Sequence, residues 1–340
     1  MKITFLIGNG FDIAIASKLN IRETGYKDIY CRSEFYGYNK VELGNNKLVK
    51  SIFDDKEDLR SDFEDGLVSY FNNLNDESEV LEFYRDKDNF CGYIHEYLKY
   101  FYEANVKNKN FINICIDEFS NSILRFIDRM DANDKIKVKD YLFSKDDGSE
   151  TIFVNFINFN GTNTLKLLVD ELKSKKLNMM VGNKTFKLVL EDVNYVHSKL
   201  GGKTQNYHEY AFGTTSKNNI KNQLSLPKSI CNLLNKTNYN FKEWVKDTDL
   251  FITHGLSLGN SDEYYWGEVI EKIYKDSMLI DFPFVKKESK MSEENIDRIK
   301  KQIFKKIAKY DDNSKVDQNI IISICSEFKN QQDSAGIFSF

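Results

Sequence analysis

The chain has 340 residues, with 48 lysines and arginines against 52 aspartates and glutamates, so its formal charge is −4. Aromatic residues make up 14% of the chain, which argues against intrinsic disorder. The near-neutral charge argues against a dedicated nucleic-acid binder with a basic surface. The five cysteines form neither a disulfide framework nor a metal motif. No apolar stretch is long enough to span a membrane. These features predict a cytoplasmic, helix-rich globular protein without a membrane segment or a metal.

The chain opens with a predicted strand, a glycine turn and a helix. Residues 2–7 are apolar, and the run stops at Gly8, which is typical of a buried strand. A helix is predicted over Phe11–Leu19. Glycines in the turn let backbone N–H groups approach a phosphate at a helix start. Nucleotide binding and a plain strand–helix turn both fit, because Ile13 replaces the third small residue of the dinucleotide fingerprint.

Residues 31–145 are predicted to form a mostly helical insertion. Apolar residues recur there at three- and four-residue spacing in four segments: Leu59–Leu74, Val80–Tyr84, Tyr93–Tyr102 and Phe111–Met130. We expect residues 1–30 and 146–340 to form one α/β domain that this insertion interrupts.

Beyond residue 146, predicted strands alternate with predicted helices. The strands are Thr151–Asn158, Lys187–Leu190, Asn194–His197, Glu209–Phe212, Asp249–His254, Ile280–Val285 and Asn319–Ile324. The helices are Asn163–Lys175, Tyr239–Lys246, Asp262–Lys275 and Glu293–Tyr310. This alternation predicts a Rossmann-like α/β fold with a parallel, doubly wound sheet.

Candidate site residues follow these strands. Asn160, Thr162 and Asn163 come just after the strand at 151–158, at the edge where a doubly wound sheet binds its ligand. Asparagine side chains can bond ribose hydroxyls or orient a water, whereas a plain helix cap is the alternative. His197 ends a later predicted strand and is one of only four histidines, so it is either an acid–base group or a structural residue.

The segment 254–262 raises a competing interpretation. Gly255, Ser257 and Gly259 match the nucleophile elbow of serine hydrolases. In α/β-hydrolases the catalytic histidine follows the serine, but no histidine follows His254. We therefore interpret Ser257 as a turn residue or a ligand-contacting hydroxyl.

Six motifs in this order resemble the AbiH family of bacterial phage abortive-infection proteins. They are Phe5–Asp12, Glu23–Asp28, Ser61–Glu64, Asn158–Leu165, Tyr195–His197 and His254–Asp262. Gly161 stands where that family usually has a tyrosine.

The layout is also similar, more distantly, to sirtuin-type NAD-consuming domains. That resemblance implies catalytic roles for two residues: Asn160 would orient the ribose or the attacking water, and His197 would act as a base or ribose ligand. The implied NAD-contacting residues are Gly8, Asn9, Gly10, Phe11, Asp12, Thr162, Asn163, Ser257, Gly259 and Asp262.

Together these resemblances imply phage defence by abortive infection, through hydrolysis of NAD at the nicotinamide–ribose bond. That bond breaks through an oxocarbenium-like transition state, which needs positioning and charge stabilisation more than a strong nucleophile. One alternative is a nucleotide-sensing or partner-binding module without turnover. Another is a nuclease that uses Asp12, Asp62 and Glu64, which the near-neutral charge disfavours. The phage-derived trigger and homo-oligomer formation stay open.

Overall fold

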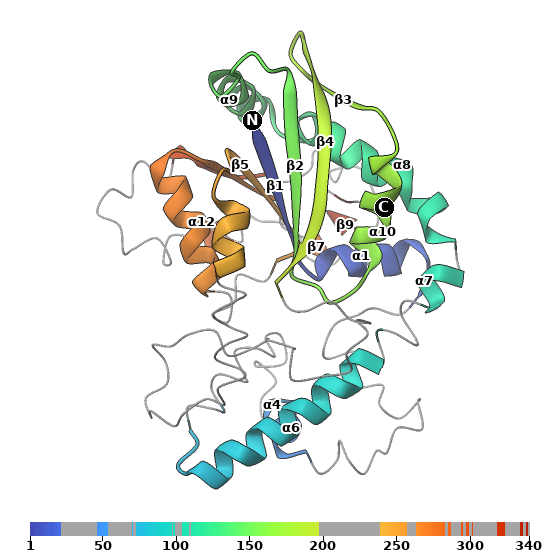
Figure 1. Ribbon diagram of the computed structural model, residues 1–340, viewed down its shortest axis with the longest axis vertical. Coiled ribbons are helices and arrows are strands. Elements are labelled where there is room, and N and C mark those ends of the chain that lie inside the picture. The colour runs from blue at the N-terminus through green and yellow to red at the C-terminus, as the bar shows by residue number, and fades with distance from the viewer. Residues whose placement is uncertain are drawn as a thin grey trace.

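A sheet of seven strands lies at the centre of the computed structural model (Figure 1). The structure describes residues 1–21, 46–53, 70, 73–96, 98, 104–108, 110–196, 239–256, 263–282, 285–286, 294, 297–298, 301, 318–323, 334–335 and 338. Among the helices within these ranges, none has the length and apolar character that crossing a membrane requires.

The strand order makes this a Rossmann-like sheet. The strands lie side by side in the order β3 (Leu177–Val181), β4 (Lys184–Tyr195), β2 (Thr151–Asn158), β1 (Lys2–Ile7), β5 (Leu250–His254), β6 (Met278–Phe282) and β8 (Ile320–Ile322). All neighbours are parallel except β3 and β4. Counted along the chain, the six parallel strands have the order 3-2-1-4-5-6, which is that of the Rossmann fold. The predicted α/β architecture is confirmed.

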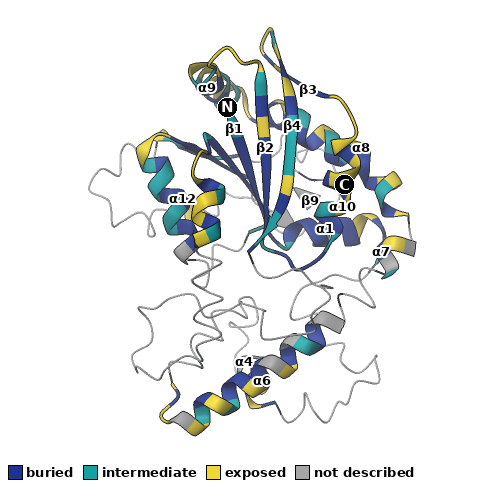
Figure 2. Ribbon diagram, in the orientation of Figure 1, coloured by how far each residue is buried: buried dark blue, intermediate teal, exposed yellow. Residues whose placement is uncertain are grey.

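Helices cover both faces of the sheet. On one face, α1 (Gly10–Lys18), α8 (Phe111–Leu124) and α10 (Thr164–Lys173) share a core with residues such as Phe5 and Phe156. On the other face, α12 (Glu263–Lys275) and the helical residues 239–245 share a second core with Leu6 and Phe251. Figure 2 shows the central strand β1 as almost wholly buried, and β5 and β6 are buried along their whole length, whereas β4 is exposed in part. This burial on both faces explains why β1 and β5 are continuous apolar runs.

The β3–β4 hairpin corrects the predicted strand pattern. Separate strands were predicted at 187–190 and 194–197, and none at 177–181, but β4 is one long strand and β3 pairs with it antiparallel. Glu191 and Asp192 interrupt the apolar pattern without ending β4, because they pair at the surface with Lys2 and Lys173. The hairpin turns at Gly182, whose φ of +58° is the left-handed conformation that two-residue turns require.

The segment between α1 and β2 is helical in its described parts. It contains α4 (Lys47–Phe53), α6 (Glu77–Glu96), α7 (Ala104–Asn108), α8, the 3₁₀ helix η4 (Phe126–Arg129) and α9 (Ala132–Ser144). In Figure 1, α4 and α6 lie together below the sheet, whereas α8 lies against it. The domain boundaries at residues 30 and 145 stay predictions, and α8 belongs to the same hydrophobic core as the sheet.

The remaining predicted elements are found only in part. Strands β5, β6 and β8 and helices α1, α10 and α12 begin and end within a few residues of their predicted bounds. A short two-stranded sheet of β7 (Val285–Lys286) and β9 (Ser334–Ala335) was not predicted. The predicted strand at 209–212 and most of the predicted helices at 59–74 and 293–310 lie outside the described residues.

Candidate functional site

The loops after β1, β2 and β5 meet at the carboxyl edge of the sheet. Because β1 lies between β2 and β5 in parallel register, Ile7 is next to Asn158 on one side and His254 on the other. The chain order reverses between β1 and β5, and such a switch point is where doubly wound sheets bind ligands. The predicted site residues 8–12, together with Asn160, Thr162 and Asn163, therefore lie at the same edge of the sheet.

Backbone packs against backbone at this switch point. Gly8 donates its N–H to the carbonyl oxygen of His254 over 2.8 Å, and Gly10 donates to that of Gly255 over 3.2 Å. Phe11 donates its N–H to the carbonyl oxygen of Gly8 over 3.1 Å. A Cβ on Gly8 would lie 2.4 Å from the Gly255 oxygen, so the close approach requires glycine. Three amides of the predicted phosphate turn are thus bonded to the chain's own carbonyls.

Asp12 joins the start of α1 to the loop after β2. Its side chain is fully buried, and its carboxylate accepts hydrogen bonds from the hydroxyls of Thr162, at 2.7 Å, and Thr164. Burial of a carboxylate is costly unless hydrogen bonds compensate for the lost water, as they do here. Asp12 and Thr162 were both predicted to contact a ligand, and the contacts between them indicate a positioning role.

Asn160 is held in place by the same loops. Its side-chain Nδ2 donates to the Gly8 carbonyl oxygen over 2.9 Å, and its backbone N–H donates to the Asn158 side chain over 2.9 Å. Only 9% of its surface is exposed. No donor among the described residues reaches its Oδ1, so this oxygen can accept a hydrogen bond from a ligand or a water.

Phe11 and His254 belong to the core beneath this edge. Both are fully buried, and the rings lie edge to face with centroids 6.5 Å apart. Burial, with a smaller effect of the Arg129 cation, lowers the pKa of His254 from 6.5 to about 3. The imidazole is therefore neutral at physiological pH. Phe11 was predicted to contact NAD, and its contacts here are with core side chains.

Two other predicted residues lie at helix starts. Asn9 precedes α1 and is half-buried, and its carbonyl oxygen accepts the N–H of Ile13. Asn163 precedes α10. The structure does not test the other predicted site residues, His197, Ser257, Gly259 and Asp262, nor the acids Asp62 and Glu64, because all six lie outside the described residues.

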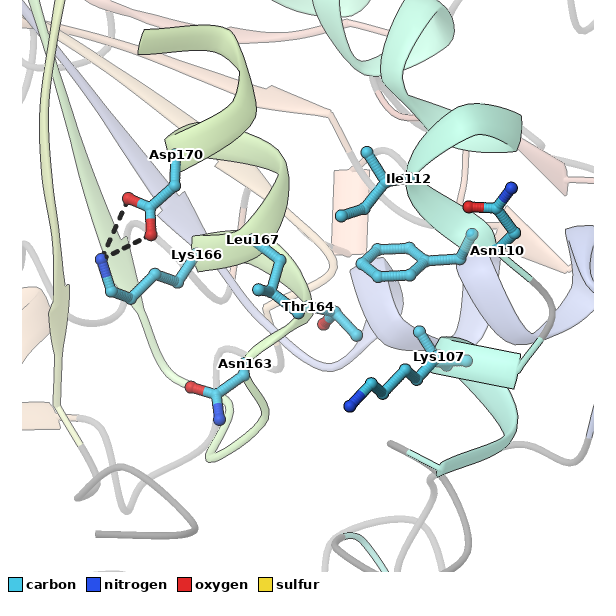
Figure 3. Close-up of a pocket in the computed structure, with 10 residues that line it drawn as sticks. Lys107, Asn110, Ile112, Asn163, Thr164, Lys166, Leu167 and Asp170 are labelled. Carbon is cyan, nitrogen blue, oxygen red and sulfur yellow. Dashed lines mark hydrogen bonds and ion pairs between the residues drawn. The ribbon is translucent and has the colours of Figure 1, made fainter. Parts of the chain in front are cut away.

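A cavity of about 470 Å³ lies between α10 and the α7–α8 turn (Figure 3). Asn163 and Thr164 line one side, and Lys107 and Asn110 line the other. In the sequence, the polar run 107–110 lies between the predicted helical segments Tyr93–Tyr102 and Phe111–Met130. No periodicity or motif marks these residues as partners of the loop after β2, because more than 50 residues separate them in the chain.

Comparison with known proteins identifies the family. Residues 4–284, most of the chain, match the model described as bacteriophage abortive infection AbiH. The chain belongs to the AbiH family. No curated protein matches it. The AbiH match covers residues 4–7 of β1, all of β2 and β5, and all six motifs of the sequence, and it supports a role in phage abortive infection.

Proposed function

We propose that this AbiH chain acts in abortive infection by hydrolysing NAD at its nicotinamide–ribose bond. The observation that carries the proposal is Asn160, whose amide is fixed to the Gly8 carbonyl oxygen at the switch point of a Rossmann-order sheet. A neutral amide with a free acceptor oxygen suits a reaction that depends on orientation.

In the proposed reaction, water adds to C1 of the ribose and the bond to the nicotinamide nitrogen breaks. Nicotinamide leaves with the electron pair of that bond, and the water loses one proton to solvent or to a base. Asn160 orients the water or a ribose hydroxyl through Oδ1. His197 is the proposed base, and Ser257, Gly259 and Asp262 are the proposed contacts of the adenosine half.

Three amides of the glycine turn already have hydrogen-bond partners within the chain. The N–H groups of Gly8, Gly10 and Phe11 are bonded to backbone carbonyls. The space that a side chain would fill at Gly8 is filled by Gly255. For these glycines we therefore propose a positioning role, in which they hold Asn160 at the edge of the sheet.

Nicotinamide release is the direct test. The purified chain is incubated with NAD, with and without lysate from phage-infected cells, and nicotinamide is measured by chromatography. Asn160→Ala should reduce release by about 10²-fold, the usual cost of one positioned polar group. Asn178→Ala, on the exposed surface of β3, is the matched control and should leave release unchanged.

Thermal unfolding of Asn160→Ala separates a loss of chemistry from a loss of fold. No nicotinamide under any condition, together with full phage protection by Asn160→Ala in cells, would exclude hydrolysis at this site.

A second candidate function is a nucleotide-binding defence module without turnover. The cavity at α10 favours it, because the described residues that line the cavity include neither histidine nor cysteine and so offer no nucleophile–base pair of these types. This candidate predicts that a nucleotide co-purifies intact. It also predicts that substitutions in α7 and α8, and not those at Asn160, abolish protection. The nuclease alternative gains no support from Asp12, whose carboxylate is buried against two threonines.

A further inference from the structure

We propose that the cavity between α10 and the α7–α8 turn binds a small phosphate monoester that carries a flat aromatic ring, of about nucleotide size. Asn163 and Thr164, which follow Asn160 in the chain after β2, line this cavity, and Asn160 is not among its described lining residues. The proposal concerns binding alone, and it rests on the proposed function only for the choice of adenine as the ring of the probe.

The size and lining of the cavity suit a small organic ligand. Its volume of about 470 Å³ falls within the range of about 300–1,000 Å³ that is usual for such sites. The apolar part of the lining comes from Val106, Phe111, Ile112 and Leu167. Leu167 is 43% exposed although it is large and apolar, so the mouth of the cavity offers a hydrophobic surface to a ring.

The charge of the cavity favours an anion. Lys166 is paired with Asp170 over 2.8 Å, so these two charges compensate each other at the rim. Lys107 is exposed and has no ion pair with any residue that the structure describes. Figure 3 shows its side chain extending from α7 toward the turn at Asn163 and Thr164. Among the lining residues that the structure describes, two lysines and one aspartate give a formal charge of +2 − 1 = +1.

The start of α10 adds to this preference. Asn163, which precedes α10, and Thr164, its first residue, both line the cavity, and the amino end of a helix carries a partial positive charge. A phosphate between Lys107 and this helix start would meet the ammonium as a point charge. The glycine turn after β1 has three of its amides occupied, so the cavity is the better place for a phosphate.

Isothermal titration calorimetry on the full chain tests the proposal with AMP, adenosine and inorganic phosphate. AMP should bind in the millimolar range or tighter, and adenosine and phosphate should each bind more weakly than AMP, because each lacks half of the complementary groups. Lys107→Gln should weaken AMP binding by at least about fivefold, equivalent to about 1 kcal/mol. Lys137→Gln, the same change of charge on an exposed position of α9, should leave it unaltered.

Three results would overturn the inference. They are an absence of saturable AMP binding, equal affinities for AMP and adenosine, and equal weakening by Lys107→Gln and Lys137→Gln. Nicotinamide release without AMP binding would count against the cavity alone. AMP binding without nicotinamide release would count against the proposed hydrolysis alone.

Discussion

Gly255 combines two constraints at the scale of a single residue. Its φ is +63°, in the region that disfavours any side chain, and a Cβ there would lie 2.5 Å from the Cα of Gly10. The neighbouring atoms are backbone atoms of another buried loop, so they cannot move aside as the end of a flexible side chain could. The turn after β5 and the turn after β1 are thus packed as one unit.

Gly255→Ala should therefore cost about 3 kcal/mol or more of the free energy of unfolding, measured with urea. The control is Gly148→Ala. Gly148 also has a positive φ, +84°, but no atom within 4 Å of its added Cβ, so only the backbone cost of about 1 kcal/mol applies. Equal losses in the two variants would show that the contact between Gly255 and Gly10 contributes nothing.

At the scale of elements, one aromatic side chain from the far end of the chain connects several of them. Phe338 is fully buried. The centroid of its ring lies 5.2 Å from that of the Phe119 ring in α8 and 5.2 Å from that of the Phe11 ring in α1. It also meets His254 of β5 edge to face at 5.1 Å. The residue thus fills the space between two helices and the centre of the sheet.

Phe338→Ala should cost about 3–5 kcal/mol of the free energy of unfolding, because it removes buried surface and leaves a cavity among rings. Phe153→Ala in β2 is the matched control, since 44% of that side chain is exposed, and its loss should be clearly smaller. If both variants unfold at the same urea concentration, Phe338 does not hold α1 and α8 to the sheet.

At the scale of the whole molecule, two buried ionisable groups give stability opposite dependences on pH. Burial raises the pKa of Asp281 from 3.8 to about 6, although the Thr253 hydroxyl donates to it. Between pH 3.8 and about 6 the folded state therefore binds more protons than the unfolded state, and the contribution of Asp281 to stability falls as pH rises. The pKa of His254 is lowered to about 3, so its contribution is lost as pH falls below 6.5.

Asp281→Asn should remove the pH dependence of stability that comes from Asp281 and leave the one that comes from His254. Its stability relative to the parent chain should therefore increase from pH 4 to pH 6, by up to about 1.4 kcal/mol per pH unit. Urea unfolding at several pH values measures this difference. For the control Asp140→Asn, on the exposed surface of α9, the curve of unfolding free energy against pH should run parallel to that of the parent chain. A parallel curve for Asp281→Asn would contradict the burial of a proton in the folded protein.

Most of the central sheet could be predicted because its strands are buried on both faces. β1, β2 and β5 are short apolar runs with turn residues after them, and these patterns are local. The edge pair β3 and β4 could not be predicted in the same way. Its strands are half-exposed, and Glu191 and Asp192 look like a loop until their ion pairs with distant lysines are known.

The amino-acid sequence by itself determined the positions of the buried parallel strands and of the helices between them, the six AbiH motifs, and the meeting of the loops after β1 and β2 at one edge. These follow from local apolar periodicity and from the rule that parallel strands end together. Only the tertiary structure decided what the polar groups contact. It bonds the Gly10 amide to Gly255 and the Asp12 carboxylate to two threonines, and it brings Lys107 to the start of α10. Such contacts join residues far apart in the chain, and they depend on packing distances that no local pattern encodes.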